Sequence, residues 1–168
     1  EFSQIDIEMS FIDQEDIMEM NERLLRTIWK KIKNVEVGAI PRMTYQEAMD
    51  RFGNDKPDLR FGLEIQDLGE VVKGSGFKVF DDALARGGIV RGLSIPGGAT
   101  FSRGQIDKIT ELAKKAGSKG LIWIKWESES QTQSSISKFF DHNQLVAILK
   151  KAKAQVGECL FVVADDFD

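Results

Sequence analysis

The chain has few of the residues that build disulfides and metal centres. Its 168 residues include one cysteine and one histidine. A single cysteine excludes an intrachain disulfide and a cysteine-based metal cluster, and a single histidine excludes a multi-histidine metal site within the chain. We therefore expect no metal site. Cys159 lies in an apolar run with no base near it in sequence, so we interpret it as a packed core thiol rather than a nucleophile.

Long apolar runs and an excess of positive charge are also missing. No run approaches the length of a membrane span and the first residues lack a signal-peptide pattern, so we expect a cytoplasmic protein. The formal net charge of −4 argues against a general nucleic-acid coat but allows RNA binding through a local basic patch. With 42% hydrophobic residues, the chain can bury a core.

What the chain does have is an opening segment with strict alternation. Apolar and polar residues alternate over residues 1–12, as they do in a half-buried strand. The polar side carries a carboxamide and two carboxylates, from Gln4, Asp6 and Glu8. Two interpretations are open on spacing alone: the floor of a polar pocket, or an antiparallel strand with one face in water. A helix over about 14–33, capped by Asp13, should follow.

The remaining pattern predicts an α+β fold. Thr44 should cap a helix over 45–52 that Gly53 ends, and residues 53–60 are loop by composition. The expected strands are 63–65, 77–80, 89–95, 121–126 and 159–164; the expected helices are 67–73, 81–86, one from Ser102 to about Ala116, and 142–154. Residues 127–135 should be a mobile polar loop. Helices on one face of a mixed or antiparallel sheet would give a two-layer α/β sandwich.

Several side chains have two interpretations. Trp123 and Trp126 fall on opposite faces of one strand, so at least one is core, whereas an exposed Trp126 could stack on a base. Leu112 should face inward on its helix. Pro96-Gly97-Gly98 could cradle a phosphate, but its spacing favours a tight strand-to-helix turn. A group of lysines should form a solvated face; these are Lys108, Lys114, Lys115 and Lys119.

The loop Asp55-Lys56-Pro57-Asp58-Leu59-Arg60 alternates acids with bases. In a pocket, Lys56 and Arg60 could meet phosphate while Asp55 and Asp58 hold them in place. On composition alone, a solvated turn is the simpler interpretation.

Three sets of residues resemble class II aminoacyl-tRNA synthetases, specifically the bacterial aspartyl enzymes. Residues 1–11 (Glu-Phe-Ser-Gln-Ile-Asp-Ile-Glu-Met-Ser-Phe) resemble the second strand of motif 2. Residues 51–62 (Arg-Phe-Gly-Asn-Asp-Lys-Pro-Asp-Leu-Arg-Phe-Gly) resemble the segment that follows it. The third set resembles the insertion domain called GAD and consists of residues 96–99, 102–103, 106–107, 117–121 and 137–140. The resemblance covers essentially the whole chain.

The resemblance implies a protein that charges tRNA(Asp) with L-aspartate through an aspartyl-adenylate, using ATP and Mg²⁺. It further implies a homodimer that acts on neither membrane nor DNA. It places residues 1–65 in the catalytic domain and residues 66–168 in the GAD domain. It implies that Asp6 holds the amino group of aspartate, Gln4 lines the adenylate pocket and Glu8 supports the site. It makes Asp55, Lys56, Asp58 and Arg60 an active-site or tRNA-proximal loop.

The departures from the family pattern set limits. We find no motif 1, no motif 2 arginine, no motif 3 arginine and no anticodon-reading domain, and the chain opens in mid-motif without Met. We therefore expect a piece of a longer enzyme that is inactive alone and binds no cofactor. Residues 1–12 should be poorly ordered or pair with a second copy, while 77–164 fold independently. The alternatives are a GAD-type module of a tRNA-dependent amidotransferase subunit and a purely structural insertion. Charging of asparagine tRNA stays open.

Overall fold

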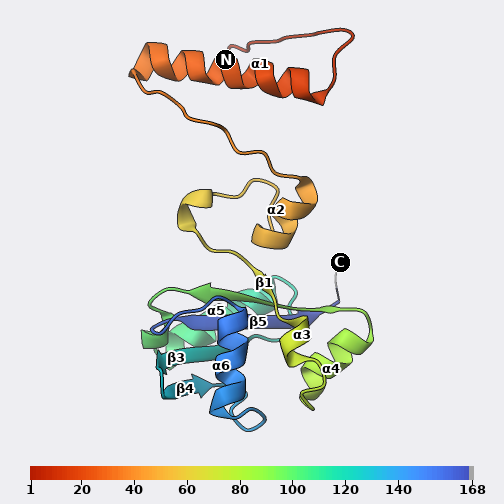
Figure 1. Cartoon of the computed structure of the whole chain (residues 1–168), viewed down its shortest axis with the longest axis vertical. Helices are drawn as coiled ribbons and strands as arrows, with labels where there is room; N and C mark the ends of the chain where they lie inside the picture. The colour runs from red at the N-terminus through yellow and green to blue at the C-terminus, as the bar shows by residue number, and fades with distance from the viewer. Residues whose placement is uncertain (167–168) are drawn as a thin grey trace. The chain divides into compact units, whose positions relative to one another are not determined.

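The computed structural model describes residues 1–166, which form two compact units (Figure 1). The first unit is Glu1–Met43 and the second begins at Thr44. Among the described residues, no helix is long and apolar enough to cross a membrane. The predicted division into a catalytic segment, 1–65, and an insertion domain, 66–168, concerns family origin rather than compactness, and it stays a prediction.

The first unit is built on one helix. α1 spans Gln14–Ile28 and continues as a π-helical turn over Trp29–Lys33, so the predicted helix over 14–33 is confirmed. Asp13 caps it by accepting hydrogen bonds from the backbone N–H groups of Glu15 and Asp16. The Asp16 carboxylate accepts the N–H of Asp13 in return, at 3.0 Å, which completes a capping box.

The opening residues do not form a strand. Residues 1–9 belong to no sheet, and Phe11 adopts a left-handed φ of 59° at the turn into α1. A strand needs a neighbour to satisfy its backbone N–H and C=O groups, and the described residues of this unit supply none. The alternating pattern is real, but no partner strand for it lies among residues 1–166.

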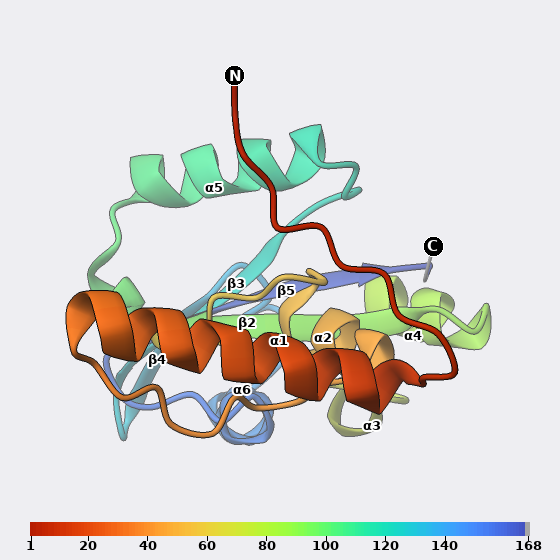
Figure 2. The same cartoon turned by 90° about the horizontal axis from the view of Figure 1, so that it is seen from above.

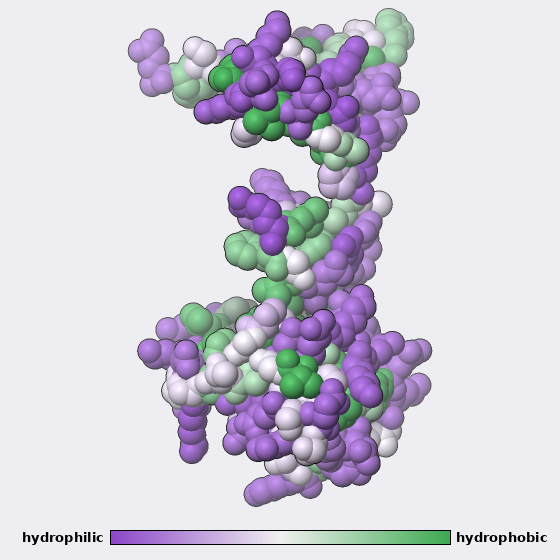
Figure 3. Space-filling view, turned by 60° about the vertical axis from the view of Figure 1, so that its left-hand side comes forward, coloured by the Kyte–Doolittle hydropathy of each residue, from purple (hydrophilic) through white to green (hydrophobic). Residues whose placement is uncertain are grey.

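The first unit has no core of its own. None of residues 1–43 is buried, and apolar side chains remain at its surface, in the upper part of Figure 3. Arg42, near the end of this unit, contacts α1 through ion pairs with Glu15 and Glu22. The exposed apolar residues of this unit include Phe2, Ile5, Ile7, Met9, Phe11, Leu25, Trp29 and Ile32.

The second unit contains a five-stranded antiparallel sheet in the order β1-β2-β5-β3-β4. The strands are β1 Gln66–Asp67, β2 Ile89–Ile95, β3 Ile122–Ser128, β4 Gln131–Ser134 and β5 Cys159–Asp165. β5 lies at the centre, where Val162 is the partner of both Gly92 on β2 and Ile122 on β3. This confirms the predicted strands at 89–95, 121–126 and 159–164, each to within a residue or two. The strand predicted at 63–65 lies just after that range, as β1.

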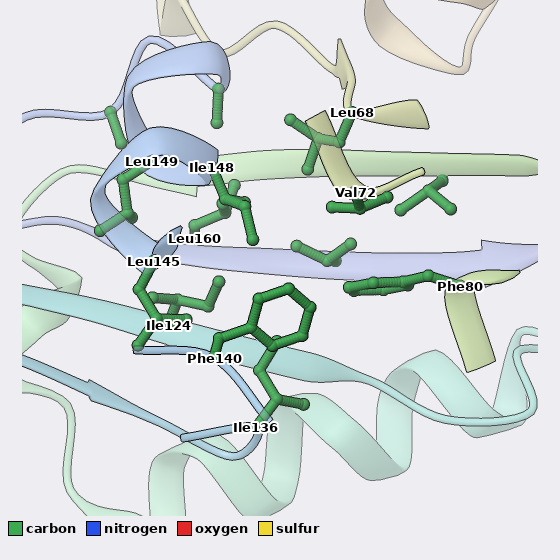
Figure 4. Packing of buried hydrophobic residues seen from close by; sticks show 14 of the residues in the cluster. Leu68, Val72, Phe80, Ile124, Ile136, Phe140, Leu145, Ile148, Leu149 and Leu160 are labelled. Carbon is green, nitrogen blue, oxygen red and sulfur yellow. The ribbon is translucent and has the colours of Figure 1, made fainter. Parts of the chain in front are cut away.

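The described part of this unit also has five helices, and the last four cover the two faces of the sheet. They are α2 Tyr45–Phe52, α3 Gly69–Val72, α4 Lys78–Ala85, α5 Arg103–Lys115 and α6 His142–Lys151, with 3₁₀ turns at Leu59–Phe61 and Gly98–Thr100. α3, α4 and α6 pack on one face around Leu160 and Val162 (Figure 4). α5 lies on the opposite face (Figure 2), where Ile106 packs with Cys159 and Phe161. The α+β class is confirmed, but the expectation of helices on one face holds only for the first group.

The smaller cluster explains the cysteine. Cys159 is fully buried, and this burial raises the pKa of its thiol to about 11. At that pKa the thiol is protonated at neutral pH, so the interpretation as a packed core thiol is confirmed.

The predicted strand at residues 77–80 is wrong. Phe77 is the N-cap of α4 and residues 78–80 form its first turn, because Phe80 and Ala83 recur at helical spacing and are buried. The ring of Phe77 packs edge-on against Phe80, with centroids 5.0 Å apart. The Asp81 carboxylate accepts the N–H groups of Gly74 and Gly76 at 3.0 and 2.9 Å, which fixes the preceding turn. A short, mostly apolar run fits a strand or a buried helix equally well.

The predicted mobile loop over residues 127–135 is also wrong. These residues complete β3, turn, and form β4, which pairs with β3 through Trp126 and Thr132. The imidazole of His142 holds the hairpin, since Nδ1 lies 3.1 Å from Oγ1 of Thr132 and Nε2 lies 3.1 Å from the carbonyl of Glu129. Polar composition reflects the edge position of β4 rather than an absence of structure.

Two side chains also differ from expectation. Trp126 is buried in the core beside Ile124, which excludes it as a surface for base stacking. Leu112 is exposed, because it lies outside the face of α5 that Ile106 and Ile109 turn toward the sheet.

Gly98 offers a test of this packing. An added Cβ would lie 2.7 Å from Cβ of Cys159 and 3.1 Å from its backbone N, whereas at Gly104 in α5 nothing lies within 4 Å. Gly98→Ala should therefore lower the free energy of unfolding by about 1–3 kcal/mol through overpacking. Gly104→Ala, the control, should raise it by roughly 0.5–1 kcal/mol, because alanine is the better helix former. Urea unfolding of both variants measures this, and an unchanged stability in Gly98→Ala would contradict the close contact.

Candidate functional site

The first set of predicted site residues lies on the extended opening segment. Gln4, Asp6 and Glu8 are all exposed, and Figure 2 shows this part of the chain as an open trace. Among the described residues, no hydrogen bond or ion pair engages these three side chains. In an extended chain, alternate residues fall on one side. A carboxamide and two carboxylates are therefore presented together, free to meet a ligand or the remainder of a longer protein.

The second set lies on a loop of the other unit, and this loop carries its own structure. Gly53 and Gly62, with φ of 66° and 64°, bracket it at both ends in the left-handed region that favours glycine. Within it, the N–H of Lys56 donates to Oδ1 of Asn54 at 2.9 Å. Asp58 caps the 3₁₀ turn by accepting the N–H of Arg60 at 3.0 Å. The loop is a sequence of local turns and not a slack connection.

Asp58 and Arg60 form an ion pair within this loop. Nε of Arg60 donates to Oδ1 and Oδ2 of Asp58 at 2.8 and 3.0 Å. These bonds, followed by the backbone bond, lower the pKa of Asp58 to about 2 and raise the pKa of Arg60. The Arg60 side chain is 90% exposed, so its guanidinium stays open to an anion. Asp55 and Lys56 are exposed beside it.

The base of the loop is closed by contacts that sequence reasoning missed. Arg51 donates to Glu47 and to Glu64, each at 2.6 Å, and its backbone carbonyl accepts the N–H of Ile65 at 2.7 Å. These bonds, that to Glu64 first, raise the pKa of Arg51, and the guanidinium lowers the pKa of Glu64. The i,i+4 spacing of Glu47 and Arg51 on a helix could have predicted their ion pair. The ion pair between Arg51 and Glu64 could not be predicted from their spacing in the sequence.

A second contact ties α2 to the sheet. Arg91 on β2 donates to the Asp50 carboxylate at 2.8 Å. Hydrogen bonds from Gln46 and then from Arg91 lower the pKa of Asp50. Because α2 leads directly into the loop, this bond fixes the start of the loop relative to β2.

A polar cleft of about 370 Å³ adjoins the end of the loop. It contains carboxylates from Glu64 and Glu158, the ammonium of Lys153 and the hydroxyl of Ser94, which donates to Glu158 at 2.6 Å. Groups of both charges line it, so it offers hydrogen bonds without a strong preference for one sign of ligand. No group of three or more His, Cys, Asp or Glu side chains that could hold a metal ion occurs among residues 1–166.

Comparison with known proteins identifies the family. The family model described as tRNA synthetases class II (D, K and N) matches residues 1–164. The chain belongs to this family. The match begins at the first residue, so the class II synthetase segment includes the alternating strand sequence and the loop at residues 53–62. The resemblance inferred from those residues is confirmed.

Relatives narrow the comparison within the class II synthetases. The chain is 49% identical over 166 residues to the aspartate–tRNA ligase of Clostridium kluyveri, with 98% of the chain covered. It is 47% identical to an aspartate–tRNA(Asp/Asn) ligase of Caldanaerobacter subterraneus subsp. tengcongensis over 98% of the chain, and 44% identical to one of Persephonella marina over 100%. The chain spans 28% of the length of each of these relatives. Their names favour a ligase over the amidotransferase alternative.

The ion pair in the loop of this synthetase segment can be measured directly. The pKa of Asp58 should be about 2, and Arg60→Gln should raise it part of the way toward the ordinary 3.8, because the backbone N–H of residue 60 remains. The pair stabilises the loop above about pH 4, and this contribution is lost as the pH falls through about 2, since the folded-state pKa is depressed. Carbon-detected NMR titration of the carboxyl group measures the pKa. Lys56→Gln is the control and should leave it unchanged; a normal pKa in the unaltered chain would contradict the pair.

Proposed function

We propose that the chain is a segment of an aspartate–tRNA ligase, and that the complete protein charges tRNA(Asp) with L-aspartate through an aspartyl-adenylate. The observation that carries the proposal is identity of 44–49% with ligases of that name over 98–100% of the chain. The complete ligase acts as a cytoplasmic homodimer. The names of the relatives divide between Asp and Asp/Asn, and no residue of this chain favours one of the two.

Asp6 is the residue assigned to the substrate. Its carboxylate would accept hydrogen bonds from the ammonium group of aspartate, which requires an acid without a cation of its own. The exposure of Asp6 and the absence of an ion pair to it in the described part of the chain support this role. Gln4, two residues earlier, would line the adenylate pocket, and Glu8, two residues later, would support the site from the same side of the segment.

The loop at residues 53–62 is proposed to lie near the active site or the tRNA of the complete ligase. Arg60 supports this role, because its ion pair to Asp58 fixes the guanidinium while leaving it exposed. Lys56 adds a second cation, and Asp55 flanks it. Residues 66–168 would then form the inserted GAD domain, with residues 1–65 belonging to the catalytic domain.

ATP and Mg²⁺ are assigned to the remainder of the ligase. The described residues present no carboxylate cluster that fits a metal ion, so none of them is assigned to Mg²⁺. The family's motif 2 and motif 3 arginines, which grip ATP, have no counterpart in this sequence. Without cations to stabilise the developing charge on the phosphates, the chain by itself should not form an adenylate.

The role of Asp6 is tested in the complete ligase. A charge-assisted hydrogen bond contributes roughly 1.5–3 kcal/mol, so Asp6→Ala should raise KM for aspartate at least about tenfold. Steady-state kinetics with aspartate, ATP and tRNA(Asp) measure this. Glu19→Ala, which removes an exposed carboxylate on α1, is the matched control and should change neither constant. An Asp6→Ala enzyme with normal KM and kcat would remove Asp6 from the site.

The inactivity of the isolated chain is tested by ATP–pyrophosphate exchange with aspartate. We expect no exchange above background, and the complete ligase serves as the positive control. Exchange that rises in proportion to chain concentration would show that the missing arginines are not required, and would overturn the assignment of ATP to the remainder of the protein.

A further inference from the structure

The face of the sheet that carries α5 contains a second cleft, of about 310 Å³. Two of its residues, Trp123 and Lys125, are two positions apart on β3 and so lie on one face. Gln133 is the cross-strand partner of Lys125 on β4 and joins them. α5 supplies the rest, from Arg103, Ile106 and Asp107. None of these residues belongs to the site proposed above.

Lys125 is the unusual member of this cleft. It is only 8% exposed, yet no carboxylate in the described part of the chain lies within ion-pair distance of its ammonium. Nζ donates one hydrogen bond, to the carbonyl of Phe101 at 2.5 Å, and lies 5.9 Å from the ring centroid of Trp123. An ammonium has three N–H groups, and a buried charge without a counter-ion is destabilising. An anion entering the cleft would supply that counter-ion.

The other residues specify what kind of anion fits. Arg103 is exposed at the first position of α5 and makes no ion pair among the described residues, so a second cation flanks the opening. Asp107 contributes one negative charge, which leaves the lining with a net charge of +1. Trp123 is half-buried and presents an aromatic surface, and Gln133 is exposed and offers both a donor and an acceptor. Cations beside an aromatic ring are the elements that bind single-stranded nucleic acid.

We propose that this cleft binds one nucleotide of an RNA strand. The base stacks on Trp123, the phosphate lies between Lys125 and Arg103, and the amide of Gln133 bonds to the base edge or the ribose. The proposal rests on the proposed function only in taking the RNA to be tRNA. It agrees with the negative charge of the chain, because one or two phosphate contacts give binding no tighter than the non-specific range, on the order of 10⁻⁶ to 10⁻⁴ M.

RNA binding is measured with the chain itself, by fluorescence anisotropy of a labelled eight-nucleotide oligoadenylate RNA. Trp123→Leu should weaken binding about tenfold, and Trp123→Phe should restore most of the affinity, since stacking needs only an aromatic face. Lys125→Gln and Arg103→Gln should each make the negative slope of log K against log salt shallower by about 0.7, where K is the association constant. Lys115→Gln removes a charge on α5 outside the cleft lining and is the matched control. Variants that stay folded by circular dichroism yet bind like the unaltered chain would overturn the proposal.

A purely structural role for Lys125, as a brace to the Phe101 carbonyl, makes a different prediction. Lys125→Met keeps the packing of the side chain and removes its charge. If the lysine is kept for a ligand, this variant should melt at the same or a higher temperature while RNA binding falls. If the lysine is only a brace, the melting temperature should fall and Trp123→Leu should bind RNA normally, which overturns the proposal.

Competition distinguishes a nucleotide from a simple anion. AMP should displace the RNA at millimolar concentration, and inorganic phosphate should do so much less well, because it cannot stack. Equal displacement by both would overturn the role of Trp123. Aminoacylation by the complete ligase is measured separately. RNA binding through the cleft in a protein that charges no tRNA with aspartate would refute the proposed function alone.

Discussion

Burial of both faces of β5 is the constraint on which the second unit depends. Its side chains alternate between two apolar clusters: Leu160 and Val162 lie in one, and Cys159 and Phe161 in the other. A central strand of this kind needs cover on each side and a hydrogen-bonded neighbour along each edge. β2 and β3 form hydrogen bonds with the two edges of β5. α3, α4 and α6 cover its first face, and α5 covers its second face. Gly98 approaches Cys159 closely because this side of β5 is packed as densely as a protein interior.

The two covers are unequal, and the proposed RNA-binding cleft lies on the face with less cover. Three helices pack over the first face, and Trp126 is buried there. α5 alone crosses the second face and covers Phe161, and a cleft lined by Lys125 and Trp123 remains between α5 and the β3–β4 hairpin. The first unit illustrates the opposite extreme, because none of its residues is buried. In the longer ligase proposed above, these exposed apolar side chains would be covered by the remainder of the protein.

Local signals in the sequence predicted local structure well. The helix starts that were assigned to capping residues are confirmed at Asp13 and Thr44, because a cap is decided by residues within one turn of it. Errors arose where distant residues decide. Phe77 to Phe80 cap and begin a helix and pack in an aromatic cluster, and the polar segment 131–134 forms a strand because the edge of β3 was available for it. The opening segment has a strand sequence, but the described residues place no strand beside it.

The candidate site also contains contacts that the sequence predicts and contacts that only the fold shows. Asp58 and Arg60 are two residues apart, so their pairing could be anticipated from the loop sequence. The contacts that position this loop join Arg51 to Glu64 and Asp50 to Arg91, and no periodicity relates those positions. The same holds for the cleft: the strand that carries Trp123 was predicted from the sequence, but only the fold shows that residues of β3, β4 and α5 line the cleft together. A buried cation left without a counter-ion is a property of the packed structure, and it is the reason that this face, rather than the lysine-bearing surface of α5, is assigned to RNA.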